Sequence, residues 1–121
     1  MKIVLDTTIL VRANERSHGL ARELLTTIIE SKHTLLLSNE MLNELAKVLR
    51  RASEIVILNP LLTAPIRDVN DIIVMQTAII GEADILCTKD DDFFEEPASE
   101  YLSKLGITVL DDISLMHRIR A

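Results

Sequence analysis

The sequence predicts an α/β fold built around a parallel β-sheet. Short apolar runs alternate along the chain with segments in which apolar residues recur at helical spacing. This order is typical of parallel strands connected by helices. The short runs also lack the polar alternation of a strand with one face in water. We therefore expect a sheet that is covered by helices on both faces.

The predicted strands are short and mostly aliphatic. They cover residues 2–5 (KIVL), 34–37 (TLLL), 84–87 (DILC) and 107–110 (ITVL). Another apolar stretch, EIVIL at 54–58, could form a strand or an extended connection within the ambiguous segment 52–67. Pro60 and Pro65 exclude a long helix from that segment, because proline interrupts helical hydrogen bonding.

The predicted helices follow from apolar residues at i, i+3 and i+4 spacing. They cover residues 17–31, 41–51, 68–80, 99–106 and 112–119. Ser38 and Asn39 are both suited to cap the second of these helices. The third is apolar nearly all round, so we expect it to be buried, and Gly81 is placed to end it.

Composition indicates one soluble domain that spans residues 1–121. Hydrophobic residues make up 48% of the chain and aromatic residues only 2%, so the core must be mainly aliphatic. The single cysteine, Cys87, excludes an internal disulfide and a cysteine-rich zinc site. No signal peptide and no apolar run near the roughly 20 residues of a membrane span are recognisable, so a cytoplasmic protein is expected.

The formal net charge of −6 argues against a protein that coats nucleic acid through bulk positive charge. It leaves open an enzyme that reaches a phosphate through bound metal ions. The three histidines have no metal-ligand spacing. Neither a G-x-S-x-G nucleophile elbow nor a phosphate-binding P-loop is present. The acidic residues are therefore the best candidates for chemistry.

Several acidic residues are placed to meet at one edge of the predicted sheet. Asp6 directly follows strand 2–5, and Asp90 and Asp92 follow strand 84–87. Asp71 lies in the first turn of helix 68–80, and Glu44 lies in the second turn of the helix after strand 34–37. Because parallel strands end at the same edge, where the following helices begin, these carboxylates should converge.

Each acid also has a structural explanation. Asp71 stands three residues after Asp68, like the second member of a helix capping box. Asp6 precedes Thr7 and Thr8, which could cap a turn or bond to it. However, two carboxylates about 5 Å apart repel by roughly 3 kcal/mol at an effective dielectric near 20. A converging cluster is kept when a divalent ion or a proton compensates it, and oxygen-only ligands favour Mg²⁺ or Mn²⁺.

Four motifs, in this order along the chain, resemble those of PIN domains. VLDTTIL at 4–10 resembles the opening of the family, and SNEMLNELAKVLRR at 38–51 resembles its second-helix motif. The segment 67–94 resembles its third acid, helix, strand and T-x-D-x-D-F/L signature, in which Thr88, Asp90 and Asp92 match. GITVLDDISLM at 106–116 resembles the final strand and helix.

The resemblance implies a three-layer α/β/α sandwich with a mainly parallel central sheet. It also implies a Mg²⁺- or Mn²⁺-dependent endoribonuclease, the toxin of a VapBC-type toxin–antitoxin pair. Such a protein would act on RNA, be bound by a cognate antitoxin and form a homodimer. The catalytic and metal-binding acids it implies are Asp6, Glu44, Asp71 and Asp90, with Asp92 as an accessory metal ligand and Thr7 and Thr88 as accessory residues.

Other residues bear on the substrate. Candidate phosphate contacts are Lys47, Arg50, Arg51 and Lys89. The segment 52–67 is shorter than the helical insertion common in the family, so a clamp that flanks the substrate would be reduced. Lys89 stands where glycine is common and Thr8 where asparagine or serine is common, which affects the expected substrate preference more than the chemistry.

The run TKDDDFF at 88–94 is expected to form one side of the site. Asp91 should point to solvent, and Phe93 and Phe94 should anchor the loop in the core. A rival hypothesis is a non-catalytic α/β module that uses the same acids to bind an ion or a partner. A phosphatase or receiver-like domain matches less well, because its nucleophilic Asp near a lysine is not clearly present.

Overall fold

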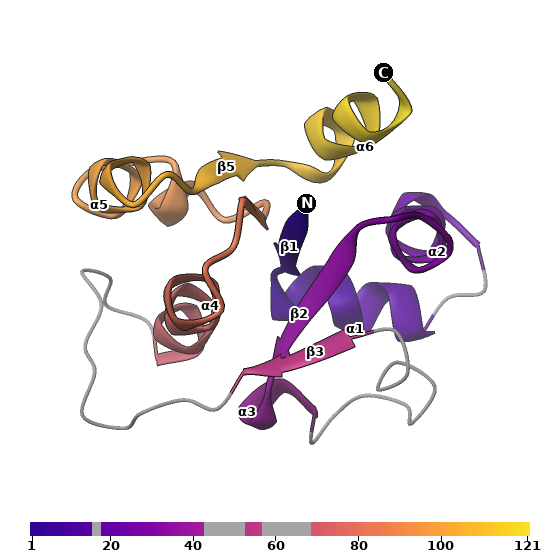
Figure 1. Ribbon diagram of the computed structural model, residues 1–121, viewed down its shortest axis with the longest axis horizontal. Helices are drawn as coiled ribbons and strands as arrows, with labels where there is room; N and C mark the ends of the chain where they lie inside the picture. Colours follow the sequence, from indigo (N-terminus) through magenta and orange to yellow (C-terminus); the bar gives the residue numbers. More distant parts are fainter. Residues whose placement is uncertain (16–17, 43–52, 57–68) are drawn as a thin grey trace.

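A computed structural model describes residues 1–15, 18–42, 53–56 and 69–121 of the chain (Figure 1). Five strands form one sheet in the order β3-β2-β1-β4-β5. Their bounds are Lys2–Leu5 for β1, Thr34–Ser38 for β2, Ser53–Val56 for β3, Ile85–Cys87 for β4 and Thr108–Leu110 for β5. Every neighbouring pair is parallel, which confirms the predicted sheet.

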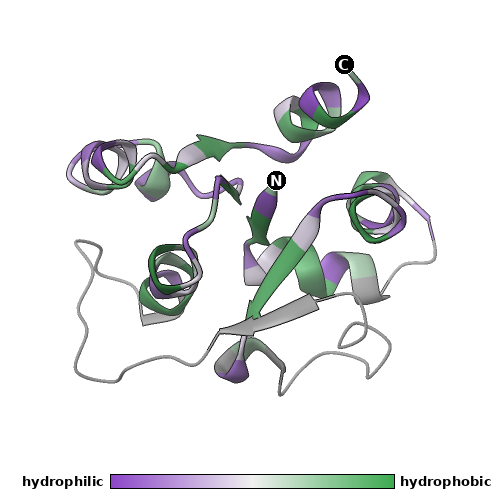
Figure 2. Cartoon of the chain, in the orientation of Figure 1, coloured by the Kyte–Doolittle hydropathy of each residue, from purple (hydrophilic) through white to green (hydrophobic). Residues whose placement is uncertain are grey.

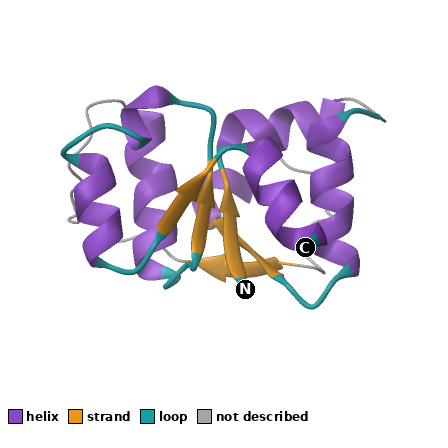
Figure 3. Cartoon of the chain, turned by 90° about the horizontal axis from the view of Figure 1, so that it is seen from above, coloured by secondary structure: helices purple, strands orange, loops and turns teal. Residues whose placement is uncertain are grey.

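Helices cover both faces of this sheet, so the fold is a three-layer α/β/α sandwich (Figure 3). One face packs against α1 (Thr7–Glu15), α2 (Leu20–Glu30) and α6 (Asp112–Arg120). The other face packs against α4 (Val69–Ile80) and α5 (Ala98–Lys104). Strands buried on both faces need apolar side chains on both, which explains their continuous hydrophobic runs.

The alternation of side chains along β1 shows how the two layers share one strand. Ile3 and Leu5 belong to the core cluster beneath α1, α2 and α6, whereas Val4 belongs to the cluster beneath α4 and α5. All three side chains are fully buried. In Figure 2, β1, β2, β4 and β5 are coloured mainly as hydrophobic, whereas the helices carry both hydrophobic and polar residues.

Helix α1 is the main element that the sequence did not predict. Its residues Thr7, Thr8, Ile9 and Val11 are β-branched and have modest helix propensity. The helix is nevertheless capped by Asp6, whose backbone carbonyl accepts hydrogen bonds from the N–H groups of Ile9 (2.9 Å) and Leu10 (3.0 Å). Packing against the sheet supplies the rest, because Ile9, Leu10 and Ala13 are buried in the core.

The structure decides two predictions that the sequence left open, the conformation of residues 54–56 and the residue that caps the helix after β2. The ambiguous stretch at 54–58 contributes to strand β3, which pairs with β2 in the register Leu37 to Ile55. Ser38 caps α3 (Asn39–Leu42), as expected, because its Oγ accepts a hydrogen bond from the N–H of Met41 at 3.2 Å. The remainder of the helix predicted at 41–51 lies outside the described residues.

Helix α4 ends at Ile80, just before Gly81, as predicted. However, Glu82 adopts the left-handed conformation, with φ of 52°. The N–H of Ala83 donates to the carbonyl of Ala78 at 2.9 Å, the bond that closes a Schellman-type helix end. The expectation that Gly81 provides the helix stop is therefore corrected: the residue that reverses the chain is Glu82.

The carboxyl ends of the central strands are aligned. Leu5 of β1 is in register with Cys87 of β4, and Cys87 is in register with Leu110 of β5. The N–H of Asp6 donates to the carbonyl of Cys87 at 2.8 Å, and the N–H of Thr88 donates to the carbonyl of Leu110 at 2.9 Å. Residues that follow these strands are thus brought together at one edge.

Among the described residues, none of the helices combines the length and the apolar character that crossing a membrane requires.

Candidate functional site

Asp6 is held rigidly at the end of β1. Its Oδ1 accepts a hydrogen bond from the N–H of Thr8 at 3.3 Å, as an N-cap of α1 does. Its Oδ2 accepts one from the Oγ1 of Thr88 at 2.5 Å. Asp6 is only 6% exposed. These contacts join β1 to β4 and give the carboxylate a structural role alongside any chemical one.

The loop after β4 is folded by its own polar groups. Thr88 is fully buried and its Oγ1 also accepts a hydrogen bond from the N–H of Asp90 at 3.0 Å. The carboxylate of Asp90 accepts one from the N–H of Asp92 at 3.0 Å and caps the short 3₁₀ helix η2 (Asp91–Phe93). One buried hydroxyl therefore links Asp6 to the backbone that carries Asp90.

The two phenylalanines of this loop have different environments. Phe93 is fully buried in the cluster beneath α4 and α5, which confirms its expected role as an anchor. Phe94 is 43% exposed, so the expectation that it also anchors the loop is wrong. Phe94 is the residue that follows η2, and because a 3₁₀ helix turns by about a third of a circle per residue, its side chain leaves the backbone in a different direction from that of Phe93. Asp91 is exposed, as predicted.

Carboxylates from two elements converge beside this loop. Ligand oxygens of Asp71, Asp90 and Asp92 all lie within 4.8 Å of one another. Asp71 comes from the first turn of α4 and is 7% exposed, whereas Asp92 is exposed. At an effective dielectric near 20, two charges at this separation repel by about 3 kcal/mol. A bound cation would remove this repulsion.

The donor set fits a hard divalent ion. All three ligand atoms are carboxylate oxygens, and no histidine or cysteine joins this group in the described part of the chain. Magnesium binds oxygen at about 2.0–2.1 Å in octahedral geometry, so two oxygens on one ion are about 2.9 Å apart when adjacent and about 4.2 Å apart when opposite. The three oxygens, which lie within 4.8 Å of one another, would have to move closer together to bind one ion. Such donors favour Mg²⁺, Mn²⁺ or Ca²⁺ over zinc.

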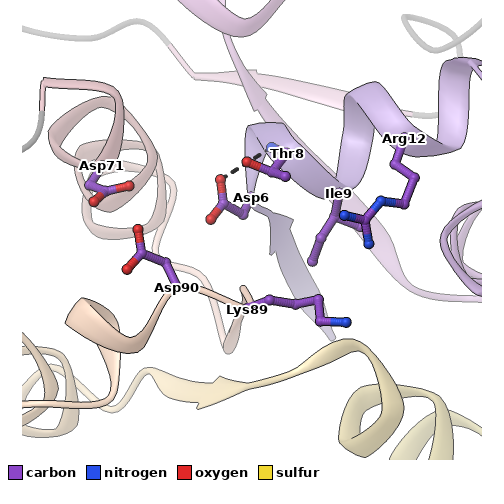
Figure 4. Close-up of a pocket in the computed structure, with 7 residues that line it drawn as sticks. All are labelled: Asp6, Thr8, Ile9, Arg12, Asp71, Lys89 and Asp90. Carbon is purple, nitrogen blue, oxygen red and sulfur yellow. Dashed lines mark hydrogen bonds between the residues drawn. The ribbon is translucent and has the colours of Figure 1, made fainter.

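A cavity of about 240 Å³ opens beside the acids. Figure 4 shows the side chains that line it: Asp6, Thr8, Ile9, Arg12, Asp71, Lys89 and Asp90. Asp71 and Asp90 lie on one side, Arg12 and Lys89 lie on the other, and Asp6 lies between them. One wall of the cavity is therefore negatively charged, and the opposite wall is positively charged.

The structure brings together most of the predicted acids that it describes. Asp71, Asp90 and Asp92 form one group, and Asp6 lines the same cavity without belonging to that group. Thr88 bonds to Asp6, whereas Thr7 is the first residue of α1 and does not line the cavity. Four predicted site residues lie outside the described part of the chain: Glu44, Lys47, Arg50 and Arg51.

Two acids after β5 were not predicted as part of the site. Asp112 is 4% exposed, and its Oδ2 lies 3.7 Å from the Nζ of Lys89. Asp111 caps α6 by accepting a hydrogen bond from the N–H of Ser114 at 2.7 Å, and this bonding lowers the pKa of Asp111. The available signal was their position after an apolar strand, the same rule that identified Asp6.

Arg12 was also missed, because its place beside the cavity depends on helix α1.

Cys87 lies under the same edge of the sheet and is fully buried. Burial raises the pKa of its thiol, and the carboxylates of Asp112, Asp111 and Asp6 raise it further. A buried thiol that stays protonated is unsuited to be a nucleophile or a metal ligand.

The strand order and the two helical layers define a PIN-like fold, which confirms the fold class that the resemblance implied. No protein-family model matches the sequence, and no curated protein matches it.

Among solved structures, the chain is similar to one described as the crystal structure of VapBC2 from Rickettsia felis bound to a DNA fragment from their promoter. The similarity has a TM-score of 0.60 at 17% sequence identity and covers 92% of this chain and 98% of the other. At this level of identity the likeness concerns the fold.

Proposed function

We propose that this protein is a Mg²⁺- or Mn²⁺-dependent endoribonuclease that cleaves RNA phosphodiester bonds. The observation that carries this proposal is the convergence of Asp71, Asp90 and Asp92 within 4.8 Å at the carboxyl edge of a parallel sheet. The adjoining cavity adds Asp6, which two hydrogen bonds hold in place. Sites in open parallel sheets form at this edge.

Each acidic side chain has a proposed role in the site. Asp71, Asp90 and Asp92 would hold the ion, with Glu44 proposed as a further ligand. Asp6, oriented by Thr88, would fix the wall of the site that faces the ion. A bound divalent ion supplies Lewis-acid chemistry, which polarises a phosphoryl oxygen and makes water a better nucleophile.

Without compensation, the same acids would repel a phosphodiester. The approach of the substrate is therefore coupled to ion binding, because a bound cation offsets the repulsion between the grouped carboxylates and the negative charge of the phosphodiester. Lys89 lines the cavity and is the described candidate for a phosphate contact. Lys47, Arg50 and Arg51 are further candidates on the segment after α3.

We further propose that the protein is the toxin of a toxin–antitoxin pair and acts in the cytoplasm as a homodimer. The support is the PIN-like fold, its likeness to the VapBC2 structure, and the four ordered sequence motifs. We expect an antitoxin that neutralises the toxin to cover the acidic side of the cavity. Basic side chains of the antitoxin would complement that charge.

A second candidate is a non-catalytic module that binds an ion or a partner through the same acids. This hypothesis is favoured because two of the acids have structural roles: Asp6 caps α1 and Asp90 caps η2. Under this reading the cluster stabilises the loop when an ion is bound, and no phosphodiester is cleaved.

The test compares two neighbouring acids of one loop. Asp90→Asn keeps a side-chain oxygen that can cap η2 but removes a charged ligand, and Asp91→Asn removes an exposed charge outside the acidic group. We expect Mn²⁺-dependent RNA cleavage by the wild type, loss of about 100-fold or more in Asp90→Asn, and an unchanged rate in Asp91→Asn. Cleavage that persists in EDTA would overturn the metal dependence, and cleavage that persists in Asp90→Asn would overturn the assignment of Asp90 as a metal ligand.

Mn²⁺ titration by calorimetry separates the two candidate functions. Binding that Asp90→Asn weakens, together with no cleavage of mixed RNA by antitoxin-free protein, would favour the binding module.

A further inference from the structure

The wall of the cavity opposite the acids carries two positive charges. Arg12 comes from α1 and Lys89 from the loop after β4, so residues distant in sequence meet at one rim. In Figure 4 both side chains lie on the side of Asp6 away from Asp71 and Asp90. A ligand that fills this cavity therefore meets two regions of opposite charge.

Arg12 is held at the rim by the register of α1. It lies one helical turn after Thr8, so both residues are on the exposed face of the helix that borders the cavity. Ile9, which also lines the cavity, is only 2% exposed, and with Leu10 it anchors the helix in the core. Within the described residues Arg12 makes no ion pair, so its five N–H donors are available to a ligand.

Lys89 is held at the rim by a buried acid. The side chain of Asp112 is 6% exposed and that of Lys89 is 52% exposed, with Nζ and Oδ2 separated by 3.7 Å. Asp112 is itself fixed, because its Oδ1 accepts a hydrogen bond from the N–H of Ile113 at 2.9 Å. An ammonium has three donors, so Lys89 can keep this ion pair and still bind a further anion.

We infer that Arg12 and Lys89 form a phosphate-binding subsite for a backbone phosphate adjacent to the one that is cleaved. This inference rests on the proposed nuclease function. A guanidinium matches the geometry of a phosphate, and an ammonium adds a point charge beside it. The acidic side of the cavity accepts a phosphate only together with a cation, whereas the basic side needs none.

The consequence concerns the class of substrate. The site would favour a nucleic-acid strand with consecutive phosphodiesters over a molecule with a single phosphodiester, because only the former occupies both regions. Asp112 acts here as a positioning residue: it orients Lys89 and does not touch the substrate.

Binding is the first readout, measured by fluorescence anisotropy with a labelled single-stranded RNA in Ca²⁺, with the RNA checked for integrity afterwards. We expect Arg12→Ala and Lys89→Ala each to weaken binding about three- to tenfold. The double variant Arg12→Ala/Lys89→Ala should reduce the slope of log K against log salt by about 0.7, the value for one phosphate contact on a single strand, and each single variant should reduce it by part of that amount. Arg12→Lys should recover most of the slope, because it keeps the charge.

Lys104→Ala is the matched control. Lys104 is an exposed cation that pairs with Glu100 on α5 and does not line the cavity. Its loss should leave affinity and salt slope at wild-type values. Salt slopes of Arg12→Ala and Lys89→Ala that coincide with the wild-type slope would overturn the subsite.

A second readout separates the subsite from the reacting centre. Bis(p-nitrophenyl) phosphate has one phosphodiester and no neighbouring phosphate. In Mn²⁺, the loss of kcat/KM in Arg12→Ala should be at least about fivefold larger for RNA than for this compound. Equal losses on both substrates would overturn the inference, because they would place Arg12 at the cleaved phosphate.

The two proposals fail differently. A wild-type protein that hydrolyses neither substrate contradicts the nuclease function, while the salt slopes still decide whether Arg12 and Lys89 contact a backbone phosphate.

Discussion

The hydroxyl of Thr88 joins the end of β1 to the loop after β4, so a change at this group affects both the fold and the site. It donates to Oδ2 of Asp6 at 2.5 Å and accepts from the N–H of Asp90 at 3.0 Å. Thr88→Val has nearly the same shape but removes both bonds. We therefore expect this substitution to destabilise the protein and to release Asp6 and Asp90 from their relative positions.

The size of the effect follows from the two partners. A hydrogen bond to a charged group is worth about 1.5–3 kcal/mol, and a partly buried N–H without its acceptor costs about 1 kcal/mol. The free energy of unfolding should fall by about 3 kcal/mol. With an m-value of roughly 1.5 kcal/mol per molar urea, the unfolding midpoint would fall by about 2 M.

The assay is urea unfolding followed by circular dichroism, with two controls. Thr88→Ser keeps the hydroxyl and loses only a buried methyl group, so it should cost about 1 kcal/mol. Thr108→Val makes the same chemical change at an exposed position of β5 and should stay within about 0.5 kcal/mol of the wild type. A Thr88→Val protein as stable as Thr88→Ser would refute the reasoning.

Three further predictions concern charge and burial. Asp92→Asn should raise the melting temperature in EDTA at low salt, because it relieves repulsion within the acidic group. In a thermal shift assay the same substitution should reduce the stabilisation by Mn²⁺, and a lower melting temperature in EDTA would contradict the prediction. Asp111→Ala should cost about 1 kcal/mol at pH 7, since it removes the cap of α6. The pKa of Asp111 is lowered in the folded state, so the charged carboxylate stabilises the fold above its ordinary pKa of 3.8, and this stabilisation is lost as the pH falls through the lowered pKa. The difference in unfolding free energy between wild type and Asp111→Ala, measured from unfolding curves, should therefore be smaller at pH 3 than at pH 7. Cys87 should react with Ellman's reagent only as fast as the protein unfolds, because burial raises its pKa and excludes the reagent; rapid reaction under native conditions would show that the thiol is accessible.

The sheet was predictable because its signal is local. A parallel strand buried on both faces must be apolar throughout, and KIVL, TLLL, DILC and ITVL carry that requirement in their own composition. Helix α1 was not predictable in this way. Its β-branched first residues have modest helix propensity, and the cap from Asp6 and the packing of Ile9 and Leu10 against the sheet stabilise it.

The site shows the same division. The positions of Asp6 and Asp90 followed from the rule that sites form after the ends of parallel strands. The role of Thr88 as the bond between them, and the pairing of Lys89 with Asp112, could not be derived from spacing. Phe94 illustrates the limit within one motif, because its exposure depends on the 3₁₀ turn of η2 and not on its hydrophobicity.

By itself, the sequence determined the fold class and the edge of the sheet where the acids gather, and it led to the expectation of a hard cation there. Hydrophobic periodicity and residue type are properties of short segments, so they can be read before the chain is folded. Only the tertiary structure decided that Asp71, Asp90 and Asp92 share one group, that Asp6 lies beside it, and that Arg12 faces them across the cavity. These outcomes depend on how α1 and α4 pack against opposite faces of the sheet, and distances of a few ångströms between remote side chains are set by that packing.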